Sequence, residues 1–108
     1  MTTRVKNNEL KKIVSVIKEK YKPEKIILFG SLAWGKATED SDIDLFVVKN
    51  TKKARRERNR DVSRLLIDRK VAVDILVYTP SEVKERRRLG DFFIENILNS
   101  GKLLYAKK

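Results

Sequence analysis

The chain has 108 residues, with 26 Lys and Arg against 15 Asp and Glu, a formal net charge of +11, and neither cysteine nor histidine. A chain of this length is expected to form one domain, residues 1–108, without a separate substrate-recognition domain. The absence of cysteine and histidine excludes disulfides, thiolate or imidazole zinc sites, and Ser-His-Asp or Cys-His catalysis. Carboxylates remain as the metal ligands and general bases that the chain can offer.

The positive charge predicts attraction to polyanions such as nucleotides or RNA. The basic runs at 52–60 and 84–88 are not interleaved with aromatic residues, so solvated helix faces explain them better than a dedicated RNA-binding surface does. The sequence has no apolar signal region and no apolar run of about 18 residues. A cytoplasmic protein with no membrane contact is therefore expected.

Hydrophobic periodicity and turn residues predict most of the helices and strands. In chain order they are a helix at 8–21, a strand at 25–29, a short helical piece at 32–34, a strand at 42–49, a helix at 52–69 capped by Thr51, a strand at 71–78, helices at 80–89 and 91–100, and a strand at 103–105. Thr79 and Glu82 form a capping box, and Asp91 caps the helix that follows Gly90. The predicted fold class is α/β (α+β), with helices packed on a mixed β-sheet.

Two aspartates begin the second predicted strand, shortly after a Gly30-Ser31 turn. Side chains alternate along a strand, so Asp42 and Asp44 are expected on one face and Ile43 on the other. Two like charges at one point are unfavourable unless a cation lies between them, and a divalent metal carrying phosphate oxygens is the usual candidate. The pattern therefore predicts a phosphate-handling site.

A third aspartate, Asp74, is the only charge in the apolar run 71–77. If this strand lies beside the strand of Asp42 and Asp44, the three carboxylates form a cluster suited to two Mg²⁺ ions, with Mn²⁺ as the alternative. Simpler interpretations remain open. Gly30 can be a turn glycine with Ser31 as the N-cap of a short helix. Asp42 and Asp44 can be solubility charges at a strand edge.

These residues resemble the polymerase-beta-like nucleotidyltransferase superfamily. The resemblance rests on Gly-Ser-x-Ala-x-Gly at 30–35, Ser-Asp-Ile-Asp-Leu at 41–45 and the later Asp74, and it is strongest to the minimal nucleotidyltransferase branch. It implies that Asp42, Asp44 and Asp74 are catalytic metal ligands, and that Gly30 and Ser31 hold the phosphates of an NTP, with ATP as the expected substrate. The family often has basic residues in this turn, where the present chain has Leu32 and Trp34. Lys36 is the nearest substitute.

The resemblance also implies a biological setting. The minimal branch commonly pairs with a helical HEPN-domain protein as a toxin–antitoxin system, in which the antitoxin transfers AMP to a tyrosine of its partner. Two alternatives stay open. One is a non-catalytic antitoxin that neutralises the partner by binding it, and the other is nucleotidyl transfer to RNA or to a small molecule.

Three aromatic residues have no place in the expected site. Trp34 is expected to pack under the Gly-Ser turn, with contact to a partner as the alternative. Phe92 and Phe93 are adjacent on one helix and cannot both face the same core, so one of them is expected to be exposed for association.

Overall fold

The computed structural model describes residues 3–35 and 42–108, and the side chains from residue 7 onward. Its elements run in the order α1 (Thr3–Val16), one turn of π-helix η1 (Ile17–Tyr21), β1 (Lys25–Phe29), α2 (Ser31–Trp34), β2 (Ile43–Val48), α3 (Arg55–Leu65), β3 (Val73–Tyr78), α4 (Pro80–Arg88), α5 (Phe92–Ser100) and β4 (Lys102–Ala106). None of the helices in these ranges is long and apolar enough to span a bilayer.

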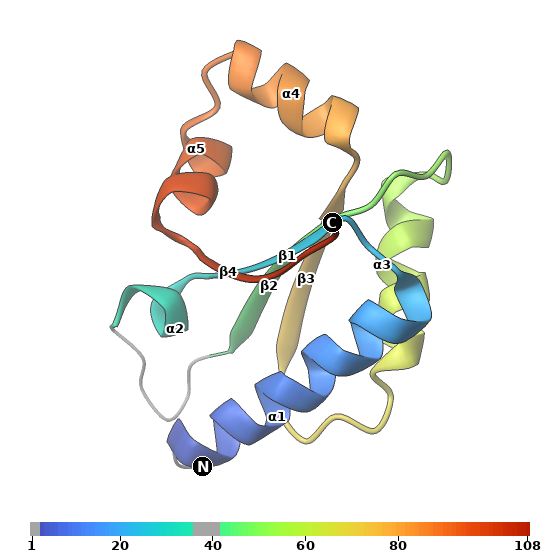
Figure 1. Ribbon diagram of the computed structural model, residues 1–108, viewed down its shortest axis with the longest axis vertical. Coiled ribbons are helices and arrows are strands. Elements are labelled where there is room, and N and C mark those ends of the chain that lie inside the picture. Colours follow the sequence, from blue (N-terminus) through green and yellow to red (C-terminus); the bar gives the residue numbers. More distant parts are fainter. Residues whose placement is uncertain (1–2, 36–41) are drawn as a thin grey trace.

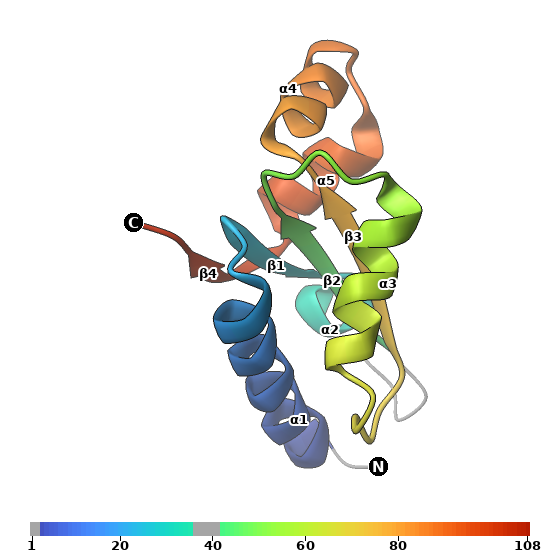
Figure 2. The same cartoon turned by 90° about the vertical axis from the view of Figure 1, so that its right-hand side faces the viewer.

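The four strands form one mixed sheet in the order β3-β2-β1-β4. β2 and β3 are parallel, and α3 makes the crossover between them, whereas β1 is antiparallel to both β2 and β4. Figures 1 and 2 show α1 and α3 on one side of the sheet and α4 and α5 on the other. The predicted α+β class with a mixed sheet is confirmed.

Each face of the sheet has its own buried cluster because successive side chains of a strand alternate between the two faces. On one face, Ile13 of α1, Ile17 of η1 and Val62 of α3 pack against alternate residues of β1 and β2. On the other face Ile94 and Ile97 of α5 pack on a second set of strand residues, Ile27, Phe29, Phe46, Val48 and Tyr78. The aspartates of β2 and β3 belong to this second face.

Two of the helix starts predicted from capping residues, those at Thr79 and Asp91, are confirmed. The Thr79 side chain accepts a hydrogen bond from the backbone N–H of Glu82, whose carboxylate accepts one from the N–H of Thr79 in return, and Pro80 is the first helical residue. The Asp91 carboxylate accepts hydrogen bonds from the N–H groups of Phe93 and Ile94 at 3.0 and 3.2 Å.

The predicted start of α3 is wrong. The helix begins at Arg55 after an N-cap, Ala54, that makes no side-chain bond. Thr51 instead accepts a hydrogen bond from the N–H of Lys53, forming a local turn. The nearly buried Arg58 fixes this arrangement by donating hydrogen bonds to the carbonyl of Lys53 at 2.7 Å and to the carboxylate of Glu82 at 2.6 Å. The helix therefore begins without a side-chain cap, and Arg58 ties its first turn to Lys53 and to Glu82 of α4.

Candidate functional site

The two strand aspartates lie opposite each other in the sheet. Asp44 of β2 and Asp74 of β3 are register partners in the parallel pair. Each lies two residues before a member of the second core, Phe46 and Leu76, so both side chains point to the α4–α5 face. Asp42 lies immediately before β2. Asp44 is partly buried, whereas Asp42 and Asp74 are exposed.

The Gly30 turn closes against Asp44. β1 ends at Phe29, the antiparallel partner of Asp44, and the next residue, Gly30, has φ 78° and ψ −160°. A Cβ at this position would overlap the Asp44 carboxylate. Glycine is therefore needed at position 30 for two reasons: the positive φ and the close approach of the backbone to the carboxylate.

Ser31 does not cap α2. The N-cap of this short helix is Gly30, and it makes no side-chain hydrogen bond. The N–H groups of Ala33 and Trp34 both donate to the carbonyl of Gly30, at 3.0 and 3.1 Å. The capping interpretation of Ser31 is therefore wrong, because the turn closes through its own backbone.

The environment of Asp44 disfavours its ionised form. Burial, followed by the charges of Asp74 and then Asp42, raises the pKa of Asp44 above its ordinary value. An aspartate with a raised pKa in the folded state stabilises the fold below its unfolded pKa, and this contribution is lost as the pH rises through the folded pKa. At neutral pH the ionised Asp44 is therefore a source of electrostatic repulsion in the metal-free chain.

Asp44→Asn should raise the melting temperature of the metal-free chain at neutral pH by a few degrees, because it removes this repulsion. The gain should vanish near pH 3, about one unit below the ordinary pKa of aspartate, where wild-type Asp44 is itself neutral. Thermal unfolding followed by circular dichroism in EDTA at both pH values measures the difference, with the exposed Asp68→Asn as a matched control. A lower melting temperature for Asp44→Asn at neutral pH would mean that the carboxylate serves the fold.

The carboxylates of Asp42, Asp44 and Asp74 are suitable ligands for divalent ions. The available donors are carboxylate oxygens, which Mg²⁺ and Mn²⁺ prefer. Within residues 3–35 and 42–108, no three acidic side chains are grouped closely enough to enclose an ion. The exposed Asp42 and Asp74 carboxylates are free to change rotamer, whereas Asp44 is held beside Gly30. The donor set therefore fits a metal, but convergence of the three groups would accompany binding.

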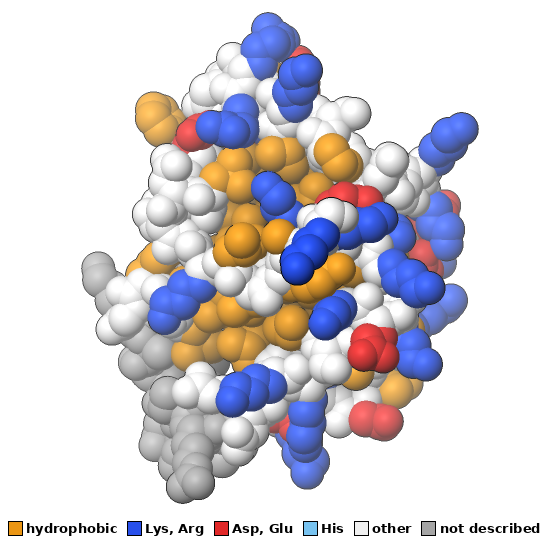
Figure 3. All heavy atoms as spheres, in the orientation of Figure 1, with side chains coloured by type: hydrophobic (Ala, Val, Ile, Leu, Met, Phe, Trp, Pro, Cys, Tyr) orange, Lys and Arg blue, Asp and Glu red, His pale blue; other side chains and the backbone are white. Residues whose placement is uncertain are grey.

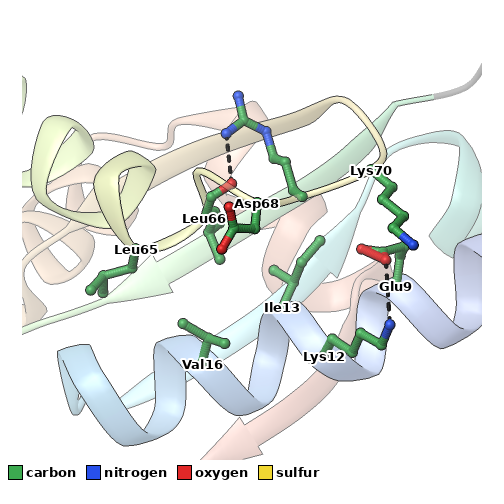
Figure 4. Close-up of a pocket in the computed structure, with 9 residues that line it drawn as sticks. Glu9, Lys12, Ile13, Val16, Leu65, Leu66, Asp68 and Lys70 are labelled. Carbon is green, nitrogen blue, oxygen red and sulfur yellow. Dashed lines mark hydrogen bonds and ion pairs between the residues drawn. The ribbon is translucent and has the colours of Figure 1, made fainter.

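The hollow shown in Figure 4 is a separate feature. It has a volume of about 270 Å³ and lies between α1 and the segment after α3, where Ile13, Val16 and Leu66 give it an apolar wall. These residues belong to the other side of the sheet from the aspartates.

The sequence predicted roles for two residues near the turn, Lys36 and Trp34. Lys36, the predicted substitute for a turn base, lies outside the described residues. Trp34 is 41% exposed, so the expectation that it packs under the turn is wrong. It lines a shallow hollow of about 460 Å³ with Ala33 of its own helix and Asn96 and Ser100 of α5.

Comparison with known families identifies the chain. Residues 11–108 match the family model described as polymerase beta, nucleotidyltransferase. This chain belongs to the polymerase beta nucleotidyltransferase family. The predicted resemblance is confirmed, and the protein is a nucleotidyltransferase.

Relatives of this nucleotidyltransferase agree with the assignment. A protein of Methanocaldococcus jannaschii named "Putative protein adenylyltransferase" is 34% identical over 99 residues, covering 89% of this chain and 94% of the relative. A second protein of the same name and organism is 53% identical over 38 residues, covering 35% of this chain and 38% of the relative.

Solved structures agree on the fold. A nucleotidyltransferase crystal structure from Sulfolobus solfataricus has a TM-score of 0.65 and 25% identity, covering 93% of this chain and 79% of the other. A chain of the toxin–antitoxin MntA-HpeT mutant has a TM-score of 0.59 and 20% identity, covering 92% and 73%.

One neighbour of the aspartates in this nucleotidyltransferase was not predicted from the sequence. The ring of Phe93 packs edge-on against Phe29, with 5.8 Å between the ring centres and 89° between the planes. Phe29 is the register partner of Asp44, so an aromatic side chain of α5 borders the site. No local pattern signals this contact, because it joins residues far apart in the sequence.

Proposed function

We propose that this chain is a Mg²⁺-dependent nucleotidyltransferase that moves an NMP group, with AMP from ATP as the expected case, to a hydroxyl group of a protein. The observation that carries the proposal is the alignment of Asp44 with Asp74 on adjacent parallel strands beside the Gly30 turn. The names of the two archaeal relatives support a protein as the acceptor.

Each residue of the proposed site would have its own role, which follows from its position. Asp42 and Asp44 would hold the ions that carry the nucleotide, and Gly30 and Ser31 would hold its outer phosphates at the backbone turn. Asp74, on the neighbouring strand, would help to hold the catalytic ion, orient the acceptor hydroxyl and draw its proton. Bound Mg²⁺ would supply positive charge that neutralises the triphosphate and lowers the pKa of the acceptor hydroxyl.

The transfer itself is a substitution at phosphorus. The acceptor oxygen forms a bond to the α-phosphorus of the NTP, and the bond between that phosphorus and the oxygen bridging to the β-phosphorus breaks. Pyrophosphate leaves with the bonding electrons, and the hydroxyl proton passes by way of Asp74 to solvent. Positioning and charge stabilisation are the main tasks of the protein in such a reaction.

The expected partner is a helical HEPN-domain protein in a toxin–antitoxin pair. The resemblance to the minimal nucleotidyltransferase branch implies it, and one structural neighbour is part of a toxin–antitoxin structure. In this role the chain is the antitoxin, and transfer of AMP to a tyrosine of the partner silences the toxin. The product of the adjacent reading frame is the acceptor to be tested.

Metal-dependent nucleotide binding is the first test. Calorimetric titration with ATP in Mg²⁺ should show binding to the wild type and none to the Asp42→Asn/Asp44→Asn double variant, because the charge that retains the ions has been removed. Titration in EDTA should show no binding to either. Equal binding to both proteins in Mg²⁺ would remove the aspartates from the nucleotide site.

A second candidate is a non-catalytic antitoxin that acts by binding alone. Two observations favour it, namely the absence of a preformed group of three acids among the described residues and the apolar Leu32 and Trp34 in a turn where the family often has bases. It predicts a tight complex whose formation needs neither ATP nor Mg²⁺. Transfer to RNA or to a small molecule is the remaining alternative, and labelled ATP with those acceptors tests it.

A further inference from the structure

An apolar corner projects from the turn between α4 and α5. Leu89 is 59% exposed, Phe92 89% and Phe93 49%. We call these three residues the α4–α5 corner. An exposed phenylalanine forgoes the favourable free energy of burying its ring, and the core does not require it, because Ile94 and Ile97 already bury the inner face of α5.

The backbone holds this corner in a fixed shape. Leu89, Gly90 and Asp91 donate backbone hydrogen bonds to the carbonyls of Glu85, Arg87 and Arg86 at 3.0 to 3.1 Å. Gly90 takes a positive φ of 74°, and the Asp91 side chain caps the next helix. The apolar groups are therefore presented on a preorganised turn, as an anchoring surface requires.

One residue of the corner, Phe93, lies near the carboxylates. Phe93 packs on Phe29, the neighbour of Asp44 in the sheet. Figure 1 shows α5 above α2, at the end of the sheet where β1 meets the Gly30 turn. A molecule seated on the corner would extend naturally to Asp44 and Asp74.

Basic residues lie on the α4 side of the corner. The segment 84–88 carries Lys84 and three arginines, Glu85 within it and Asp91 and Glu95 beside it offset part of this charge, and the net charge of the chain is +11. Ion pairs of Arg87 with Glu95 at 2.9 Å and of Arg88 with Glu85 at 2.6 Å fix two of these side chains. A second copy of the chain would bring the same positive charge, so electrostatic complementarity calls for an acidic partner.

The apolar groups favour a protein over RNA. Bases stack on flat aromatic faces, whereas Leu89 offers an aliphatic side chain that can only fill an apolar pocket. Exposed aromatic anchors within a polar rim are typical of the central contacts of protein interfaces.

We propose that the α4–α5 corner is the docking surface for the acceptor protein, whose complementary face is apolar at its centre and acidic at its rim. Docking there brings the acceptor hydroxyl to the Asp44–Asp74 edge. The inference rests on the proposed transfer to a protein, but the docking step needs no nucleotide and is measured separately.

A competing apolar surface lies around β4. Figure 3 shows apolar side chains gathered near the middle of that face, with Lys and Arg among them. Two hollows of about 490 and 520 Å³ include Val83 with Leu98 and Leu10 with Tyr105. β4 is separated from the strands of Asp44 and Asp74 by β1, so a partner seated there would not reach the carboxylates directly.

The test compares three single substitutions at exposed apolar side chains. Phe92→Glu removes the corner, Leu103→Glu places a charge on β4, and Ile67→Glu changes a side chain that is 79% exposed beyond α3. Calorimetry without nucleotide, with the purified product of the adjacent reading frame as the probe, measures complex formation. Phe92→Glu should raise Kd by about thirtyfold, the effect of losing a central aromatic contact, while Ile67→Glu leaves it unchanged.

Each result has one meaning. A raised Kd for Leu103→Glu with an unchanged Kd for Phe92→Glu would place the partner on the β4 face and overturn the inference, as would the absence of any complex with the wild type. Nucleotidyl transfer to RNA that depends on Phe92, with no complex with the protein, would also overturn it. A wild-type complex that Phe92→Glu weakens, but that carries no AMP, would uphold docking and contradict the proposed transfer.

Discussion

Asp74→Asn should lower the rate of nucleotidyl transfer by about a hundredfold to a thousandfold, the effect of removing one group that acts on the reacting atoms. Nucleotide binding should stay within about threefold of the wild type, because Asp42 and Asp44 still hold the ions that carry the triphosphate. Single-turnover transfer from labelled ATP and calorimetry of ATP binding in Mg²⁺ give the two quantities.

Asp68→Asn is the matched control for this change. Asp68 is also an exposed aspartate, but it lines the hollow on the α1 side of the sheet. Its substitution should alter neither quantity. Unchanged transfer by Asp74→Asn would exclude Asp74 from the reaction, and an equal loss of binding and transfer would make it a nucleotide ligand instead.

Gly30→Ala should abolish detectable ATP binding and destabilise the fold by about 1–3 kcal/mol. The new Cβ would meet the carboxylate of Asp44, so either that side chain or the turn must move. Because both belong to the proposed phosphate and metal site, the binding geometry would be lost with the contact. Calorimetry of ATP binding and chemical denaturation measure the two effects.

Gly90→Ala is the control for a positive φ without the contact. Gly90 has nearly the same φ, 74° against 78°, but a Cβ there meets no atom within 4 Å. It should cost about 1 kcal/mol of stability through backbone strain and leave ATP binding intact. If the two variants bind ATP equally well, the closeness of Gly30 to Asp44 has no functional meaning.

Features that depend on neighbouring residues are predictable from the sequence. The capping box at Thr79, the cap at Asp91 and the alternation that puts Asp44 on one face of its strand all arise within a few residues. The spacing of Gly30, Asp44 and Asp74 was sufficient to predict the family, because the chemistry restricts both residue type and order. The mixed sheet followed from this pattern.

Features that depend on distant contacts are not predictable in this way. The first turn of α3 is held by the ion pair of Arg58 with Glu82, far along the chain. The exposure of Trp34 and the packing of Phe93 on Phe29 depend on where α5 lies over the sheet. The adjacency of two phenylalanines predicted that one of them is exposed, and the structure exposes both, Phe92 at 89% and Phe93 at 49%, although Phe93 also packs on Phe29.

Intact-mass spectrometry of the acceptor protein is the most direct test of nucleotidyl transfer by the aspartate edge. The helical product of the adjacent reading frame is incubated with the wild type, ATP and Mg²⁺, and in parallel with Asp74→Asn. We predict a mass increase of one AMP per modified tyrosine with the wild type and almost none with the variant. A tight complex with no adduct from any of the four NTPs, formed equally by wild type and variant, would contradict catalysis and leave binding alone as the function.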